Sequence, residues 1–306
     1  MKGKAIAVAF ATTLLWSGSY IVNRWAFQLG MGAMTLAGFR YSLAAAAVFV
    51  FYGKQKKPQG AKLPFVSALA IGMISYVVAQ GLQYVGQSLL TPTQVSLLIN
   101  AGMVFFIMAI DRLWLFESQK LLNYVKIAAL GLGMVLYYTP WVGPAPSLIG
   151  IVLTVIASAG CGMNITINRY MLRDKGVDRM ELTAKPMLCG GLIMLAVGLL
   201  TERLPALSVK MVGIVVYLAF VSGALGFSLW IWSQQWLSAL ESGSLNSLML
   251  IETAALDAIV FGRVLTIRRS LAIILVFAAV VLIQMNRSSS SGNTKSRRSV
   301  LKTKPN

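Results

Sequence analysis

Two acidic residues lie inside an otherwise apolar stretch near the carboxyl end of the chain. Glu252 and Asp257 both fall within residues 243–262. Burying a carboxylate in a bilayer costs on the order of 3 kcal/mol, so each acid needs a partner, water or a proton. Their spacing puts them about 140° apart around a helix, so they cannot easily share one site. Both are candidates for proton coupling, and Glu252 is also a candidate for binding a substrate amine.

The alternative to a chemical role for these acids is a structural ion pair. Glu252 would pair with Arg40 or Lys185, and Asp257, which is nearer the end of its stretch, would pair with Arg263. Arg40 could instead receive a carboxylate through both arms of its guanidinium group. The residue types alone leave these possibilities open.

Amides and tyrosines form a stripe along the third apolar stretch and its end. Tyr76, Gln80, Gln83 and Gln87 are spaced to share one helix face over three turns, and Tyr84 lies beside them. Lipid offers no hydrogen bonds, so such residues face other helices or water. The stripe predicts the lining of a substrate pathway, with hydrogen bonding between helices as the alternative.

Four other apolar stretches add side chains that could meet the same pathway. They are Trp16 and Asn23 in the first, Asn100 in the fourth, Asn164 and Asn168 in the sixth, and Trp230 in the eighth. Trp230 could stack on a flat or apolar substrate group. The structural alternative for the tryptophans is packing or an interfacial belt, and for the asparagines it is capping or linking of helices.

The elements that must position these residues are expected to be membrane-spanning helices. Of 306 residues, 57% are hydrophobic and 12% are charged, and the mean hydropathy is +0.74. A soluble domain has about a quarter of its residues charged. We count ten apolar stretches of about 20 residues. They cover roughly 5–24, 33–52, 63–83, 89–111, 121–139, 147–169, 180–200, 209–236, 243–262 and 268–286. The predicted fold is an all-α integral membrane protein with ten transmembrane helices.

The ten stretches divide into two sets of five, over residues 1–140 and 147–286, followed by a disordered basic tail over 287–306. An odd number of spans per half gives the halves opposite orientations, as in inverted-repeat transporters. Met34-Thr35-Leu36 precedes Arg40 in one half, and Met180-Glu181-Leu182 precedes Lys185 in the other. These traces favour two inverted five-helix repeats.

Charge and composition narrow the possible partners and chemistry. The chain has no histidine, which excludes Ser-His triads and His-ligated metals, so we expect no metal and no cofactor. The net charge is +18, but the cations flank apolar runs, which argues against nucleic acid as a partner.

The N- and C-termini are predicted to be cytoplasmic, because that topology puts 20 of the 27 Lys and Arg residues inside. We expect a cell (inner) membrane location and a tail lying on anionic lipid. Monomer and homodimer both remain open.

The chain resembles a known family in its first two stretches. Leu15-Trp16-Ser17-Gly18-Ser19-Tyr20, followed by Phe39-Arg40-Tyr41 and an Ala-rich run, resembles EamA-type members of the drug/metabolite transporter superfamily. Leu250-Ile251-Glu252 looks like the family's Leu-Glu-Pro motif, with Thr253 in place of the proline. The resemblance extends to about Met285. It implies a carrier that moves small metabolites or drugs, often outward, through a central pathway by alternating access.

The sequence therefore predicts a secondary transporter that exports small amphipathic metabolites, such as amino acids or related compounds, or drugs. A nucleotide-sugar or sugar-phosphate exchanger on the same scaffold is the first alternative. It would need two or more cations deep in the pathway, and only Arg40 and Lys185 are available. A membrane enzyme acting on a lipid-linked substrate is the weaker alternative, because the only grouped acids are Asp174, Asp178 and Glu181.

Overall fold

The computed structural model describes residues 2–52, 60–114, 121–138, 146–173, 175–206, 208–234, 236–237, 245–263 and 265–282. Within these ranges the regular structure is helical, apart from one isolated parallel bridge between Ala61 and Val177. The basic tail over 287–306 lies outside the described residues.

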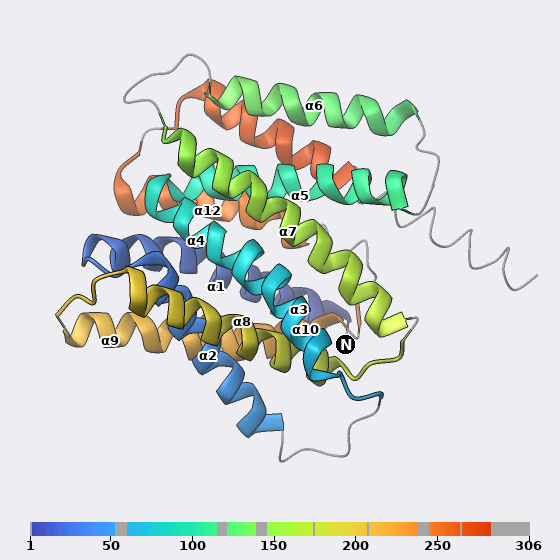
Figure 1. Ribbon diagram of the computed structural model, residues 1–306. Coiled ribbons are helices and arrows are strands. Elements are labelled where there is room, and N and C mark those ends of the chain that lie inside the picture. The colour runs from blue at the N-terminus through green and yellow to red at the C-terminus, as the bar shows by residue number, and fades with distance from the viewer. Residues whose placement is uncertain are drawn as a thin grey trace, which may run out of the picture.

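Ten helical rods run through the described ranges (Figure 1). The first half contains α1 (Lys2–Gln28), α2 (Ala33–Tyr52), a continuous rod of α3 (Phe65–Gly72), η1 (Met73–Gly81) and α4 (Leu82–Leu89), then α5 (Pro92–Trp114) and α6 (Leu121–Tyr138). The second half contains α7 (Leu148–Arg173), α8 (Arg179–Thr201), a continuous rod of α9 (Val209–Val216), η2 (Tyr217–Leu225) and α10 (Gly226–Gln234), then α12 (Met249–Phe261) and a helix over 267–282.

The distribution of side chains is that of a membrane protein. Val209, Leu200 and Ile267 are 91%, 86% and 82% exposed, whereas Ser17 and Asn23 are completely buried. Such an exterior suits lipid, which cannot satisfy polar groups. Six described helices are long and apolar enough to cross a membrane. The predicted all-α, ten-helix membrane fold is confirmed.

The main contacts between the two halves come in equivalent pairs, so that each contact has a counterpart in which the roles of the halves are exchanged. The second helices of the halves, α2 and α8, pack against each other. The first helix of each half also packs on the fourth helix of the other, as α1 on α12 and α7 on α5. A pseudo-two-fold relation between inverted repeats produces this exchange, which agrees with the predicted duplication.

Glycines allow α2 and α8 to approach closely over residues 35–42 of α2 and 191–198 of α8. A Cβ added to Gly38 would lie 2.4 Å from the backbone of Leu195, and one added to Gly191 would lie 2.7 Å from Ser42 N. At the far end of the pair, a Cβ on Gly198 would lie 2.5 Å from Thr35 N. Van der Waals packing between such close backbones is a main source of helix association in lipid.

The third rod of each half contains a π-helical segment at its centre. η1 and η2 are each nine residues long, and each follows an α-helix of eight residues. Hydrogen bonds in a π-helix join residues five apart, which widens the turn, and such segments are frequent at functional sites. The equal placement of η1 and η2 is a further sign of the repeat.

The third rod of the first half, formed by α3, η1 and α4, is also longer than the sequence predicted. It continues to Leu89 rather than ending near residue 83, and the break falls at Leu90 and Thr91. α5 then starts with a capping box, because Thr91 N donates to Gln94 Oε1 and Gln94 N donates to Thr91 Oγ1. Pro92 takes the first helical position, where no hydrogen-bond donor is needed.

The last helix of each half lies at one edge of the bundle. α6 and the helix over 267–282 run together there, shown in green and red in Figure 1. They touch where Gly133 faces Val276 and Ala272. α1, by contrast, contacts helices of both halves, and its polar residues Thr13, Ser17 and Asn23 are buried at those contacts.

Candidate functional site

Arg40 is buried at the point where helices of the two halves meet. Its side chain extends from α2, and the residue is only 5% exposed. Nη1 donates to Tyr84 Oη at 2.6 Å, and Nη2 donates to Ser222 Oγ of η2 at 2.8 Å. A longer bond of 3.4 Å joins Nη1 to Ser19 Oγ of α1. One guanidinium group thereby connects four elements from both halves.

The positive charge of Arg40 is met by rings and hydroxyl groups. The rings of Tyr41 and Tyr84 lie 5.3 Å and 5.9 Å from its Cζ atom, within cation–π range. Among the described residues, no carboxylate lies within ion-pair distance of the guanidinium group. Its Nε atom is buried and has no hydrogen-bond partner. The structural pair between Arg40 and Glu252, one of the alternatives that the sequence left open, is therefore not formed.

Trp16 lies next to this cluster and supports the π-helix of the second half. Its Nε1 atom donates to the carbonyl oxygen of Ser222 at 3.0 Å. Its ring packs on Phe227 and Trp230 of α10, with centroids 5.3 Å apart in both cases. Gly226 leaves room for this contact, because a Cβ there would lie 3.0 Å from Trp16 Nε1. Trp16 and Trp230 thus lie together, both half-buried.

The predicted stripe of amides faces α1 and α2. Gln80 Oε1 accepts from the hydroxyl of Tyr41 at 2.7 Å, and Gln80 remains half-buried. Gln83 is buried and donates to Tyr20 Oη at 2.9 Å. Both amides therefore form hydrogen bonds between helices, and Gln80 is the more exposed of the two.

The remaining members of the stripe also differ in how far they are buried. Gln87 Oε1 accepts from Asn23 Nδ2 at 2.7 Å, and both residues are buried. Tyr76 stays half-buried, and its ring meets Tyr41 edge-on at 5.2 Å. Tyr84 is fully buried against Arg40.

The predicted asparagines of the other helices lie apart from the Arg40 cluster. Asn164 Oδ1 accepts from both Ser75 Oγ and Asn168 Nδ2 at 2.8 Å, which links α7 to η1. Asn100 is buried and donates to the carbonyl oxygen of Ser96, one turn earlier in its own helix. These contacts serve as links within and between helices.

Glu252 is half-buried and is held by hydroxyl groups of α1. Thr13 Oγ1 donates to Oε1 at 2.9 Å, and Ser17 Oγ donates to Oε2 at 2.8 Å. Each hydroxyl also has a backbone carbonyl within reach, at Phe10 for Thr13 (2.8 Å) and at Met249 for Ser17 (3.4 Å). No cation pairs with Glu252 among the described residues.

Asp257 is in a different setting from Glu252. It is almost completely buried, and its Oδ1 atom lies 3.3 Å from Nε of Arg263. Its Oδ2 atom accepts from Thr93 Oγ1 at 2.6 Å and from Thr93 N at 3.3 Å, so it also caps the first turn of α5. The two acids therefore have separate surroundings, as their spacing predicted.

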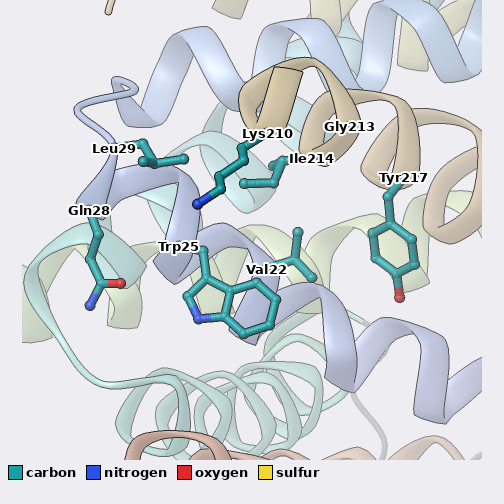
Figure 2. Close-up of a pocket in the computed structure, with 8 residues that line it drawn as sticks. All are labelled: Val22, Trp25, Gln28, Leu29, Lys210, Gly213, Ile214 and Tyr217. Carbon is teal, nitrogen blue, oxygen red and sulfur yellow. The ribbon is translucent and has the colours of Figure 1, made fainter. Parts of the chain in front are cut away.

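A pocket of about 780 Å³ opens between α1 and the rod formed by α9 and η2. Figure 2 shows Trp25 and Gln28 on one wall, and Lys210, Gly213 and Tyr217 on the other. Lys210 reaches from α9 toward α1, and its cationic head stands among mainly apolar and aromatic groups. A concave apolar site with a few polar groups is the usual form of a small-molecule pocket.

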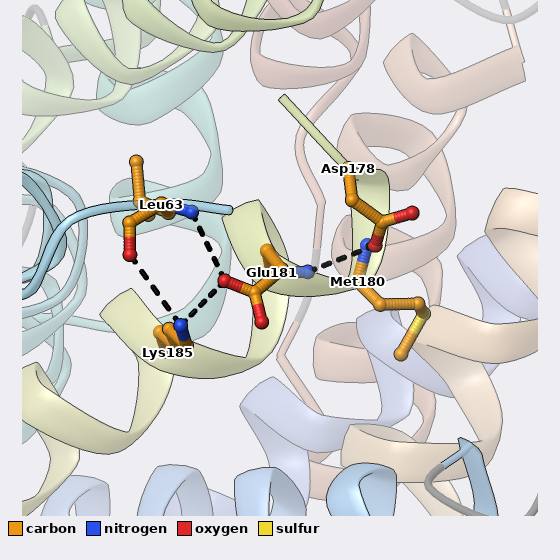
Figure 3. A network of polar contacts seen from close by, with 5 residues as sticks. All are labelled: Leu63, Asp178, Met180, Glu181 and Lys185. Carbon is orange, nitrogen blue, oxygen red and sulfur yellow. Dashed lines mark hydrogen bonds and ion pairs between the residues drawn. The ribbon is translucent and has the colours of Figure 1, made fainter. Parts of the chain in front are cut away.

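The two ends of α8 are fixed by carboxylates to the first half. At its start, Glu181 Oε2 accepts from Leu63 N at 3.0 Å and pairs with Lys185, which also donates to Leu63 O (Figure 3). We call this contact the Glu181 clamp. At the other end, Glu202 accepts from Met34 N at 3.0 Å and from Thr35 N at 2.8 Å. We call this second contact the Glu202 clamp.

Several residues of these sites were not predicted. Ser222, Thr13, Ser17 and Tyr217 are single hydroxyl groups in apolar stretches, where nothing in the pattern distinguishes them from packing residues. Arg40 was singled out, but its tyrosine cage was not foreseen. Lys210 carried a signal, since it is a lone cation at the start of an apolar run.

Comparisons with known proteins agree with this architecture. A model of the EamA-like transporter family matches the chain twice, over residues 3–139 and 148–285. A WAT1-related protein of Arabidopsis thaliana is 25% identical over 154 residues, which is 48% of this chain. The chain spans only 41% of the length of that relative.

A solved structure, titled only as the crystal structure of a protein, has a similar fold. It superimposes with a TM-score of 0.62 at 14% sequence identity. The match covers 92% of this chain and 98% of the other. At this identity the likeness concerns the arrangement of helices.

Proposed function

The chain belongs to the EamA-like transporter family, and from this premise we propose that it exports small amphipathic metabolites or drugs by alternating access. Family membership makes it a multi-pass membrane transporter rather than an enzyme. Amino acids and related compounds are the proposed metabolites. We place both termini in the cytoplasm and the chain in the cell membrane, because the positive-inside rule favours this topology.

The observation that supports transport most directly is the polar cluster around Arg40. It joins α1, α2 and α4 of the first half to η2 of the second half. Polar groups at the interface of inverted repeats are where carriers of this type bind their substrates. Two π-helical segments, η1 and η2, border the same region and supply backbone that can change its hydrogen bonding.

The clamps at the two ends of α8 suit the gates of such a cycle. A helix of 23 residues is about 35 Å long, which exceeds the thickness of the hydrocarbon core, so we place the clamps on opposite sides of the membrane. Each is a small set of hydrogen bonds between the halves, which can form and break without disturbing the packed core. We propose that the Glu181 clamp opens in the cytoplasm-facing state and the Glu202 clamp in the outward-facing state.

Glu252 is the proposed coupling residue. A hydroxyl group donates one hydrogen bond and accepts others. Thr13 and Ser17 can therefore both donate to an ionised Glu252. When Glu252 is protonated, the hydroxyl that faces its O–H group can turn to its backbone carbonyl and accept a hydrogen bond from that group, while the other hydroxyl still donates. A group that changes protonation during a cycle needs both arrangements. Asp257, with Arg263 as its partner, is better suited to bracing α12 against α5.

The nucleotide-sugar or sugar-phosphate exchanger is less well supported by the positions of the cations. Lys185, which was one of the two candidate cations, lies in the Glu181 clamp and pairs with a carboxylate. Arg40 is then the deep cation of the described core, and a phosphorylated cargo usually needs several.

Transport in proteoliposomes tests this function. Purified protein should move radiolabelled members of an amino-acid and drug panel faster than protein-free vesicles do. A folded protein that moves no member of the panel would contradict the proposed substrate class. If transport occurs, the same vesicles with an imposed pH gradient report whether protons are coupled.

A further inference from the structure

The charge of Arg40 is not compensated by the residues around it. A buried cation is costly, because the loss of water is repaid only by a good partner. Arg40 receives two good hydrogen bonds, a longer one and two aromatic faces, but its partners are neutral groups. Its Nε atom is buried and has no hydrogen-bond partner in the part of the chain that the structure describes. The guanidinium group therefore retains both charge and hydrogen-bonding capacity for an anion.

A second observation connects this arginine to a binding pocket. Tyr217 lines the pocket between α1 and α9, and its hydroxyl faces α1 where a Cβ on Gly18 would lie 3.4 Å away. Ser19, the next residue of α1, is a hydrogen-bond partner of Arg40. On the same wall as Tyr217, the pocket carries the cation Lys210 (Figure 2). Its lining contains no carboxylate. The pocket therefore carries a positive charge in a mainly apolar lining, and Tyr217 and α1 lie between it and Arg40.

The position of Glu252 limits what this site can recognise. Ser17 and Ser19 both belong to α1. Ser17 donates a hydrogen bond to Glu252, and Ser19 accepts one from Arg40. Two positions along an α-helix correspond to about 200°, so the acid and the arginine lie on opposite faces of α1. The amine and carboxylate of one amino acid are adjacent groups and cannot reach both residues at once.

We propose that Arg40 holds the carboxylate of the transported solute, and that the solute is a small organic acid with an apolar body that needs no amino group. The inference rests on the proposed transport function and names the substrate class for it. The fork of a guanidinium group matches a carboxylate in geometry as well as charge. Binding there would supply the missing counter-charge, and Lys210 would attract such an anion to the pocket.

Three matched solutes test this proposal with the wild-type protein. Proteoliposomes are given 3-phenylpropionate, its uncharged amide, and phenylalanine, which share a phenyl ring and a short chain. We expect the two carboxylates to move at similar rates and the amide about tenfold more slowly, because the amide has no charged group to pair with Arg40.

Equal transport of all three solutes would overturn the proposal but leave the transport function standing. Movement of none would contradict the proposed function, and the inference with it. Movement of phenylalanine alone would show that the amino group is required and would also overturn the proposal.

The variant Arg40→Lys tests whether Arg40 causes the preference for a carboxylate over its amide. It keeps a positive charge but loses the planar fork, so carboxylate transport should fall about tenfold while amide transport hardly changes. Arg24→Lys is the matched control, since Arg24 donates only a long bond of 3.3 Å to Ser88 O. If Arg40→Lys does not fold, competition is measured on the wild type. Excess unlabelled 3-phenylpropionate must then inhibit phenylalanine transport and the amide must not, and equal inhibition by both would reject the site.

Discussion

Glu252 of α12 accepts a hydrogen bond from Ser17 of α1 at 2.8 Å. This contact joins the fourth helix of the second half to the first helix of the first half. Ser17 is fully buried, and its alternative acceptor is the carbonyl oxygen of Met249 on the same partner helix. The hydroxyl can therefore follow a change in the charge of Glu252 without any movement of the helices.

Ser17→Ala removes this adjustable hydroxyl. We expect transport driven by a pH gradient to fall severalfold, while exchange of labelled for unlabelled substrate at equal pH is nearly unchanged. The reason is that only the driven cycle requires Glu252 to be satisfied in both protonation states. Ser228→Ala is the control, because Ser228 Oγ bonds only to the carbonyl oxygen of Ala224 in its own helix. Equal losses in both assays would make Ser17 a folding residue instead.

Gly38→Ala tests the close contact between α2 and α8. The new methyl group would lie 2.4 Å from the backbone of Leu195, and the backbone cannot move aside cheaply. We expect a destabilisation of about 1–3 kcal/mol, seen as a lower midpoint of thermal unfolding in detergent. Gly131→Ala of α6 meets nothing within 4 Å, and should be neutral or slightly stabilising because alanine favours the helix. Similar midpoints for both variants would contradict the close packing.

Gly213→Phe fills the pocket between α1 and α9. A Cβ at Gly213 meets nothing within 4 Å, so the new ring has room to enter the pocket without displacing the fold. We expect transport to fall strongly while the unfolding midpoint stays close to that of the wild type. Gly131→Phe has equal space but does not line this pocket, and it should transport normally. Unimpaired transport by Gly213→Phe would remove the pocket from the substrate route.

Glu181→Gln weakens the Glu181 clamp. It removes the charge that holds Lys185 and weakens the acceptor for Leu63 N. Cys189 lies on α8 beyond this clamp and is half-buried, so it serves as a native probe. In a Cys161→Ser background, we expect a membrane-permeant maleimide to label Cys189 faster in Glu181→Gln than in the parent. Glu202→Gln, which alters the opposite end of α8, should not speed this labelling; an equal increase in both would mean general loosening.

The composition and spacing of the chain were sufficient to predict the helices, their number and the duplication. Long apolar runs and the absence of water in lipid leave few other folds. The boundary after the third stretch was misplaced, because the link to the fourth stretch carries little charge to mark the turn. Gln83 and Gln87 near the end of the rod are held by Tyr20 and Asn23 of α1. Hydrophobicity alone does not reveal such partners.

The candidate site was predicted less completely than the fold. The stripe of Gln80, Gln83 and Gln87 was recognised, but the prediction assumed an α-helix turning 100° per residue. η1 turns less per residue, and the distribution of these amides between helix contacts and half-buried positions depends on it. The tyrosine cage of Arg40 brings together residues from distant parts of the chain, such as Tyr84 and Ser222, and no local pattern announces it.

Glu252→Gln in proteoliposomes tests whether Glu252 couples transport to protons, as we propose. Transport of a panel solute is measured with and without a pH gradient for wild type, Glu252→Gln and the control Asp257→Asn. We expect the gradient to accelerate transport by the wild type and by Asp257→Asn, although the latter is less stable because Arg263 loses its partner. Glu252→Gln should still exchange substrate but no longer respond to the gradient. A wild type that is indifferent to the gradient, or a Glu252→Gln variant that still responds to it, would contradict the claim.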